Sequence, residues 1–179
     1  MAASLAEFFS ARRAALGFGR TREAWPRLLL VFVAFGTIAT PIYLLAGLGR
    51  WAPSLTATPR DALLVVGLLF LPSLPEELLW RWLLIPPAAF DTAGKAAPVV
   101  IGTSAVYTAA HPLAAWWFVP HAWPVFSHPA FLAIVFLLGT TCGAAYILSR
   151  SLWPPVIIHW LAVLAWKFLL GGPFILLGR

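Results

Sequence analysis

Long apolar stretches constrain most strongly what this chain can fold into. The first covers residues 28–48 (LLLVFVAFGTIATPIYLLAGL) and contains no charged residue. A helix needs about 20 consecutive, mostly apolar residues to cross the hydrocarbon core of a bilayer. Further stretches dominated by apolar residues cover 62–90, 96–119, 130–148 and 154–177. The chain is therefore predicted to cross a membrane several times.

The composition agrees with this prediction. Of the 179 residues, 61% are hydrophobic and 10% are charged, whereas about 25% of an ordinary soluble domain is charged. In lipid every backbone polar group needs a partner within the protein, and a helix satisfies its own. We predict an all-α fold, a polytopic transmembrane bundle of about five or six helices in an integral multi-pass membrane protein. The single cysteine, Cys142, excludes an internal disulfide and a cysteine-based zinc site.

Basic residues outnumber acidic residues by 12 to 6. They lie mainly at the ends of apolar stretches and near the N-terminus, where anionic lipid headgroups attract them. Membrane lipid is therefore the expected partner, and nucleic acid is not. Residues 1–27 are predicted as a basic N-terminal segment with an amphipathic interfacial helix over 4–24. Residues 28–179 are predicted as the transmembrane domain.

The stretch 62–90 is too long for one plain helix and contains two prolines before its charged residues. We predict a helix that ends near Leu71 and a second helix over about 74–85. Ser73 and Glu76 have the spacing of a capping box at the start of the second helix. A helix that restarts inside a bilayer needs protein or a water-filled cavity around the break.

Charged side chains deep in a bilayer cost several kcal/mol, so they are functional candidates. The apolar run after the break contains Glu76, Glu77 and Arg81. Glu77 and Arg81 are four residues apart on nearly the same helix face and can form an ion pair. Glu76 points about 100° away from Glu77. Arg81 therefore neutralises one carboxylate and leaves Glu76 available as a base for proton transfer.

Two histidines lie within apolar stretches, His111 and His159. Tyr107 is four residues before His111, so its ring can hold the imidazole against the helix. A buried histidine can also simply bridge helices by hydrogen bonds, but the glutamate cluster in the same small bundle favours a common site. His121 and His128 lie in a connector and are interpreted as ordinary interfacial histidines.

The order of these motifs resembles a known family. Glu76-Glu77-x-x-x-Arg81, then Tyr107-x-x-x-His111, then His159 in a late apolar helix is similar to the pattern of the CAAX prenyl protease and bacteriocin-processing family, the glutamic-type intramembrane proteases. The resemblance covers about residues 62–170. It implies a multi-helix membrane protein with peptidase activity and no cofactor.

The resemblance also implies roles for individual residues. Glu76 would be the general base that activates a water, and His111 would assist or orient that water. His159 would help to stabilise the oxyanion formed on the peptide carbonyl. Glu77 and Arg81 would be a supporting pair, with Tyr107 as a further supporting residue.

One position departs from the family pattern. The family often has Asn four residues after the last histidine, and this chain has Val163 there. Valine has no hydrogen-bond donor on its side chain. Thr103, Ser104 and Trp160 are candidates for a replacement donor.

We predict an intramembrane endopeptidase that cuts a membrane-anchored peptide or protein near its C-terminal hydrophobic segment. The small size favours a bacterial inner membrane, where the role would be sorting-signal removal or peptide maturation. Two alternatives stay open. In one, Glu76, His111 and His159 bind zinc in a metallopeptidase. In the other, the protein is a non-catalytic immunity or scaffold protein of the same family, which the loss of the Asn favours.

Overall fold

The computed structural model describes residue 10 and residues 12–90 and 93–173. Within these residues the chain is helical and contains no strand, which confirms the predicted all-α bundle. The long helices are α2 (Thr21–Leu45), α5 (Ala93–Trp117), α7 (Pro129–Ser149) and α8 (Trp153–Phe168). Shorter elements lie between them: α3 (Pro59–Leu68), η1 (Leu69–Ser73), α4 (Leu74–Glu77), η2 (Leu78–Leu83), η3 (Pro87–Phe90), η4 (Pro120–Ala122) and α6 (Trp123–Phe126).

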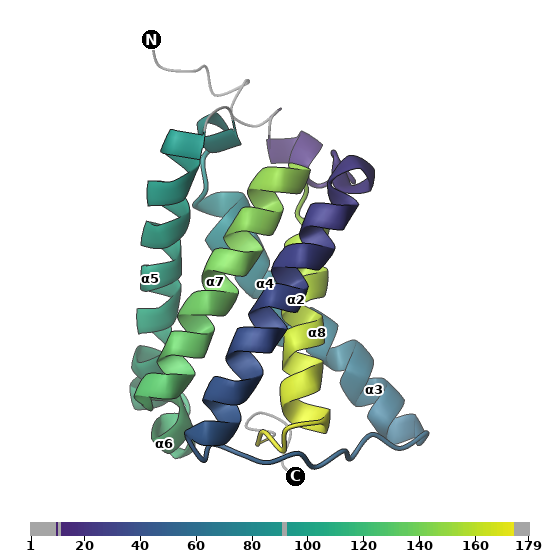
Figure 1. Cartoon of the computed structure of the whole chain (residues 1–179), viewed down its shortest axis with the longest axis vertical. Helices are drawn as coiled ribbons and strands as arrows, with labels where there is room; N and C mark the ends of the chain where they lie inside the picture. The colour runs from purple at the N-terminus through teal and green to yellow at the C-terminus, as the bar shows by residue number, and fades with distance from the viewer. Residues whose placement is uncertain (1–9, 11, 91–92, 174–179) are drawn as a thin grey trace.

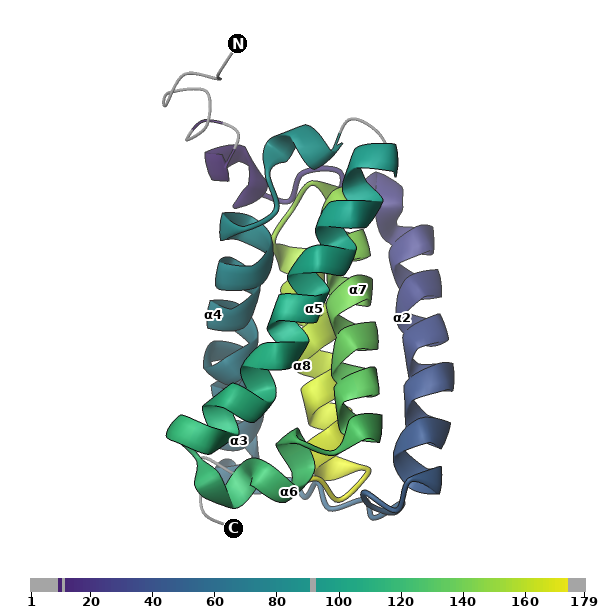
Figure 2. The same cartoon turned by 90° about the vertical axis from the view of Figure 1, so that its left-hand side faces the viewer.

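Helix α7 lies at the centre of the bundle and packs against α2, α5 and α8 (Figure 1). Half of its most apolar stretch is buried, compared with 22% for α2. Seen from the side, α4 lies at one edge of the bundle and α2 at the other, with α7 and α8 between them (Figure 2). Helix α7 is therefore mainly a protein-facing helix, whereas α2 leaves most of its surface to the surroundings.

The contact between α5 and α7 depends on two glycines of α7. A Cβ on Gly143 would lie 2.6 Å from Cγ1 of Val100, and a Cβ on Gly139 would lie 3.0 Å from Cβ of Ser104. Small residues allow membrane helices to approach each other this closely. The Cβ on Gly139 would also lie 3.2 Å from Cδ1 of Tyr107, so the glycines bring that ring against the backbone of α7.

The break predicted within the second apolar stretch is present. Leu71 has φ −147° and ψ 113°, which are not helical, and π-helical turns flank α4 on both sides. Such turns within α-helices are frequent at functional sites. The capping box predicted at Ser73 is wrong. Ser73 is itself helical, and its hydroxyl donates to the carbonyl of Leu68 at 2.9 Å, so it closes the preceding turn instead.

In the part of the chain that the structure describes, three helices are long and apolar enough to cross a membrane: Thr21–Leu45, Pro59–Leu83 and Pro129–Ser149. They support the prediction of a membrane protein. The first begins at Thr21, so the predicted boundary between residues 27 and 28 falls inside α2. The predicted boundary was placed where the apolar sequence begins. The charged residues before it do not prevent helix formation, so the helix begins earlier.

The predicted interfacial helix over 4–24 lies partly outside the described residues. Its described part does not form one continuous helix, because the chain turns at Gly19, where φ is 51°. A Cβ at Gly19 would lie 2.5 Å from the carbonyl oxygen of Ser149. The N–H group of Arg20 donates to the same carbonyl at 2.6 Å. The turn at residues 19–20 is thereby held against the connection between α7 and α8.

The last predicted helix, 154–177, ends earlier than expected. Helix α8 ends at Phe168, and Gly-Gly-Pro follows at residues 171–173. Glycine permits the positive φ of 71° at Gly171, and proline cannot continue a helix. The carbonyl of Leu169 accepts from the N–H group of Ala52 at 2.8 Å. The chain after α8 therefore packs against the connector after α2.

Candidate active site

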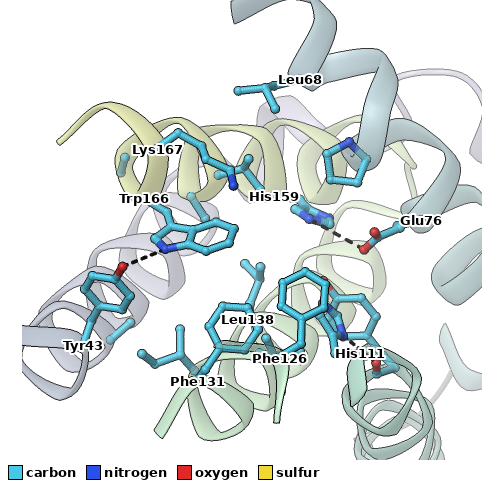
Figure 3. A pocket seen from close by; sticks show the side chains of 18 of the residues that line it. Tyr43, Leu68, Glu76, His111, Phe126, Phe131, Leu138, His159, Trp166 and Lys167 are labelled. Carbon is cyan, nitrogen blue, oxygen red and sulfur yellow. Dashed lines mark hydrogen bonds and ion pairs between the residues drawn. The ribbon is translucent and has the colours of Figure 1, made fainter. Parts of the chain in front are cut away.

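A cavity of about 880 Å³ lies inside the bundle, lined by residues from α2, α3, η1, α4, η2, α5, α6, α7 and α8. Most of its wall is apolar, with phenylalanine and leucine side chains around the polar groups (Figure 3). Its carboxylate, imidazole and ammonium groups belong to Glu76, His111, His159 and Lys167. The structure thus brings together the three residues for which catalysis was predicted, from α4, α5 and α8.

The two adjacent glutamates have different surroundings. The side chain of Glu76 is 31% exposed and faces the cavity, whereas that of Glu77 is 0% exposed. Neighbouring residues on a helix point about 100° apart, so one can face a cavity while the other faces protein. Glu76 is therefore the carboxylate that a molecule in the cavity can reach.

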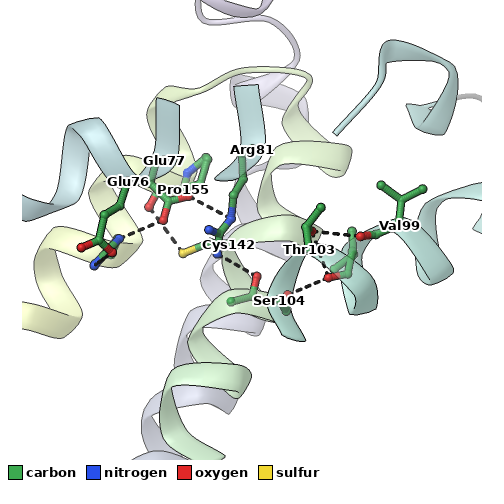
Figure 4. Close-up of polar contacts among 11 residues, drawn as sticks. Glu76, Glu77, Arg81, Val99, Thr103, Ser104, Cys142 and Pro155 are labelled. Atoms are coloured by element: carbon green, nitrogen blue, oxygen red, sulfur yellow. Dashed lines mark hydrogen bonds and ion pairs between the residues drawn. The ribbon is translucent and has the colours of Figure 1, made fainter. Parts of the chain in front are cut away.

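Glu77 and Arg81 form the ion pair expected from their spacing (Figure 4). The Oε2 atom of Glu77 lies 3.1 Å from Nε of Arg81, and the arginine side chain is 2% exposed. Arg81 also donates from Nη2 to the carbonyl of Gly139 at 3.0 Å, and its guanidinium lies 5.0 Å from the ring centroid of Tyr107. Arg81 therefore links η2 to α7 and α5 around the buried carboxylate.

Glu77 has a second partner that the sequence reading did not anticipate. Its Oε1 atom lies 2.8 Å from Nδ1 of His159. A carboxylate oxygen accepts, so the hydrogen lies on Nδ1 of the imidazole. The other ring nitrogen, Nε2, lies 3.9 Å from Oε2 of Glu76, which is too long for a direct hydrogen bond. His159 therefore stands between the two glutamates, with one nitrogen directed at each.

His111 is held by Tyr107 in two ways. Its Nδ1 atom lies 3.0 Å from the carbonyl oxygen of Tyr107, and the two rings are perpendicular with centroids 4.9 Å apart. The Tyr107 ring is also 6.2 Å from the ring of His159. Phe126 and Phe131 pack on the imidazole of His111, with ring centroids 5.3 Å and 5.9 Å away. Tyr107 is thus the aromatic residue common to both histidines.

The position that departs from the family pattern lies on the cavity wall. Val163 lines the cavity one turn after His159. The candidates for a replacement donor lie elsewhere: Thr103, Ser104 and Trp160 donate to the carbonyls of Val99, Val100 and Val65, at 2.9, 2.7 and 2.8 Å. None of the three lines the cavity, so the structure does not bring them to the site.

The sequence did not lead us to several polar residues of the cavity, among them Trp80, Tyr43 and Lys167. The sequence did contain an indication of Lys167, because this residue is an isolated charge within the last apolar stretch. The indication of Trp80 was weaker: it follows Glu76 by four residues and so lies on the same helix face. The sequence contained no indication of Tyr43, because its contact with Trp166 joins residues 123 positions apart.

His121 and His128 do not line the cavity. The Nδ1 atom of His128 accepts from the N–H group of Ala130 at 3.3 Å at the start of α7, which is a structural use of the ring. Among the described residues, no group of three His, Cys, Asp or Glu side chains is arranged to hold a metal ion.

The fold and the site together define a class, an all-helical membrane protein with a carboxylate–histidine cluster inside its bundle. Residues 58–165 match the family model described as type II CAAX prenyl endopeptidase Rce1-like, and the chain belongs to this family of CAAX-type intramembrane proteases. The matched residues include Glu76, His111 and His159, whereas α2 and the end of α8 lie outside the match. No curated protein and no solved structure matches the chain.

Proposed function

We propose that this protein is a glutamic-type intramembrane endopeptidase in which Glu76, His111 and His159 act on one water. One observation carries the proposal. A carboxylate and two imidazoles from three helices line the same apolar cavity, with Oε2 of Glu76 3.9 Å from Nε2 of His159. That separation suits a bridging water better than a direct hydrogen bond. A general base and the groups that orient its water must share the water within hydrogen-bond reach.

The hydrogen bonds of the histidines support different roles for them. His111 bonds through Nδ1 to a carbonyl, which only accepts, so Nε2 of the neutral ring is an acceptor. It can accept a hydrogen from the attacking water and orient it. His159 donates from Nδ1 to Glu77. In its doubly protonated form it would also donate from Nε2 to an oxyanion while keeping that bond.

In the proposed reaction, Glu76 takes a proton from water as the water oxygen bonds to the peptide carbonyl carbon. The charge that forms on the carbonyl oxygen is stabilised by an N–H donor, and one such donor contributes about 10²–10³ in rate. The intermediate collapses when the C–N bond breaks and Glu76 gives its proton to the leaving nitrogen. One water is consumed, a carboxylic acid and an amine are formed, and Glu76 returns to its starting state.

We propose a substrate class from the cavity wall. Apolar walls inside a membrane protein accept an apolar segment, so the substrate would be a membrane-anchored peptide or protein cut near its C-terminal hydrophobic segment. The proposed setting is a bacterial inner membrane, and the proposed role is removal of a sorting signal or maturation of a peptide.

The test is cleavage of co-expressed membrane-anchored candidate substrates, followed by mass spectrometry of the products. Glu76→Gln and His159→Gln should abolish cleavage while the protein accumulates in the membrane at its usual level. Glu23→Gln, an exposed glutamate of α2, is the matched control and should cut normally. A zinc chelator should leave cleavage unchanged. Loss of activity on chelation would favour the metallopeptidase, and a folded protein without turnover would favour the non-catalytic alternative.

A further inference from the structure

One end of the bundle carries most of its exposed basic residues. The N–H group of Arg20 donates to the carbonyl of Ser149, and Arg12 donates to the carbonyl of Leu83 at 2.7 Å, so the end of α7 and the end of η2 lie here together. Helices α2 and α5 begin at the same end (Figures 1 and 2). We call it the basic end. Among the described residues, its exposed basic side chains are those of Arg13, Arg20, Arg22, Arg27 and Lys95.

The opposite end exposes fewer basic residues. The connector after α2 lies here against the end of α8, because the N–H group of Ala52 donates to the carbonyl of Leu169 at 2.8 Å. In the described part of the chain its exposed basic side chains are Arg50 and Arg60. Lysine and arginine next to spanning helices are more frequent on the cytoplasmic side, and acidic residues affect this preference little. The basic end is therefore expected to face the cytoplasm.

Both ends have the features of a membrane interface. The three helices long and apolar enough to cross a membrane run between the two ends: Thr21–Leu45 begins at the basic end, whereas Pro59–Leu83 and Pro129–Ser149 end there. Exposed tryptophans occur at both ends, with Trp25 near the basic end and Trp117 at the opposite end. Tryptophan is enriched at both interfaces of a membrane. The two ends therefore face opposite sides of the bilayer.

The cavity lies in the half of the bundle away from the basic end. It is lined by α2 from Phe32 onward, by α5 from Tyr107 onward and by α8 from His159 onward. These are the parts of the three helices that are farther from the basic end. Phe118, which follows the last residue of α5, also lines the cavity and is 79% exposed. The cavity therefore reaches the surface at the opposite end.

Packed side chains fill the bundle between the cavity and the basic end. One buried cluster there consists of Ala15, Ile85, Ala89, Val100 and Tyr146, and a second includes Leu28, Cys142 and Ala145. The close approach of Gly143 to Val100 adds to this packing. A close-packed interior has few voids large enough for water. Neither water nor a peptide can therefore reach Glu76 through this part of the bundle.

Resting on the proposed function, we propose that the cavity takes its water and its substrate from the non-cytoplasmic side of the membrane. The bond that reaches Glu76 then belongs to a segment in the outer half of the bilayer or beyond it. Such a segment must first be inserted into the membrane or carried across it, so a translocation step supplies the substrate. An anchor whose cleavage site stays in the cytoplasmic half would meet the packed clusters instead of the cavity.

The test measures from which side each part of the bundle is accessible, so it does not depend on turnover. Single cysteines are introduced into the full chain, and a membrane-impermeant maleimide is added to intact bacterial spheroplasts. Ala114→Cys and Thr40→Cys lie on the cavity wall, and Ala57→Cys lies in the connector at the opposite end. All three should react. Ala88→Cys, on η3 at the basic end, should react only after the membrane is permeabilised. The unmodified chain is the control and should not react, because Cys142 is 0% exposed.

Reaction of Ala88→Cys in intact spheroplasts, or of the cavity cysteines only in inverted vesicles, would overturn the proposal. So would cavity cysteines that react from neither side while Ala57→Cys reacts, because water would then not enter from that side. Cleavage is measured separately, with co-expressed substrates tagged on their non-cytoplasmic segment. The expected labelling without cleavage would contradict the proposed function and leave the orientation standing. Release of the cleaved fragment into the cytoplasm would contradict the orientation and leave the peptidase activity standing.

Discussion

Oε1 of Glu77 accepts a hydrogen bond from Nδ1 of His159 at 2.8 Å, across 82 residues of sequence. The other oxygen of the same carboxylate lies 3.1 Å from Arg81. One buried carboxylate therefore fixes both the imidazole that faces the cavity and the arginine that joins three helices. Glu76, the adjacent residue, makes neither of these two contacts.

Exchanging each glutamate for glutamine should separate chemistry from stability. Glu76→Gln should lower turnover by about 10²-fold or more with normal unfolding, because it removes only the base. Glu77→Gln should lower the free energy of unfolding by about 3–5 kcal/mol, because it leaves Arg81 buried without its counter-charge. Thermal unfolding and peptide cleavage are measured on both variants. The opposite pattern would show that Glu77 is the reactive carboxylate.

Arg81→Met should destabilise the protein by a similar amount. It leaves Glu77 as an uncompensated buried carboxylate and removes the hydrogen bond to the carbonyl of Gly139. The measurement is membrane yield and thermal unfolding in detergent. Arg22→Met, at an exposed arginine of α2, is the control and should behave as the unmodified chain. If Arg81→Met is fully stable and merely slow, Arg81 belongs to the chemistry.

Tyr107 should act through its ring. Tyr107→Phe keeps the edge-to-face contacts with both histidines and should retain most activity. Tyr107→Leu removes them, and each such contact is worth about 0.5–1.5 kcal/mol, so His111 should lose its fixed orientation. We expect a lower kcat with a smaller change in KM for the leucine variant. Equal activity of the two variants would mean that the Tyr107 backbone carbonyl alone positions His111.

Val163→Asn should raise turnover if the oxyanion site lacks a donor. An Asn there would carry an N–H donor on the same helix face as His159, and one donor is worth about 10²–10³ in rate. Val163→Leu, similar in size but without a donor, is the control. A variant no faster than the unmodified chain would indicate that another donor, such as the indole N–H of Trp80 on the cavity wall, already fills this role.

Gly143→Ala should destabilise the bundle by about 1–3 kcal/mol, because its Cβ would force Val100 and α5 outward. Adding Val100→Ala should restore part of the loss. Gly102→Ala places a methyl group in open space on α5 and should be neutral or slightly stabilising. Thermal unfolding of these three variants, of the Val100→Ala single variant and of the unmodified chain checks this. Additive losses in the double variant would show that the two residues are not in contact.

The sequence predicted the parts of this molecule that follow from local pattern. Apolar length predicted helices and a membrane setting, and the spacing of Glu77 and Arg81 predicted their ion pair. The ends of helices were harder, because α2 extends through charged residues to Thr21 and α8 stops at Phe168. The length of an apolar stretch indicates whether it can cross a bilayer. Where a helix begins or ends depends instead on local turns and on contacts with the rest of the protein.

The contacts across the bundle could not be predicted. Nothing local to Glu77 shows that it bonds His159, because that bond depends on how α4 and α8 cross. The predicted capping role of Ser73 failed for a related reason. A capping serine accepts from an N–H group of the next turn, whereas Ser73 is itself helical after the bend at Leu71 and donates to the carbonyl of Leu68. The backbone conformation of Ser73 depends on how the chain bends at Leu71, which a single sequence does not display.

Helix α2 supplies Phe32, Phe35, Gly36, Ala39, Thr40 and Tyr43 to the cavity, yet it lies wholly outside the matched residues 58–165, as does Lys167. Part of the cavity wall is therefore encoded outside the stretch of the chain that contains the groups proposed to break the bond. Substitutions confined to residues 21–45 can change which molecule the cavity admits without altering Glu76 or either histidine. The shape of this part of the cavity can therefore change while Glu76, His111 and His159 stay the same.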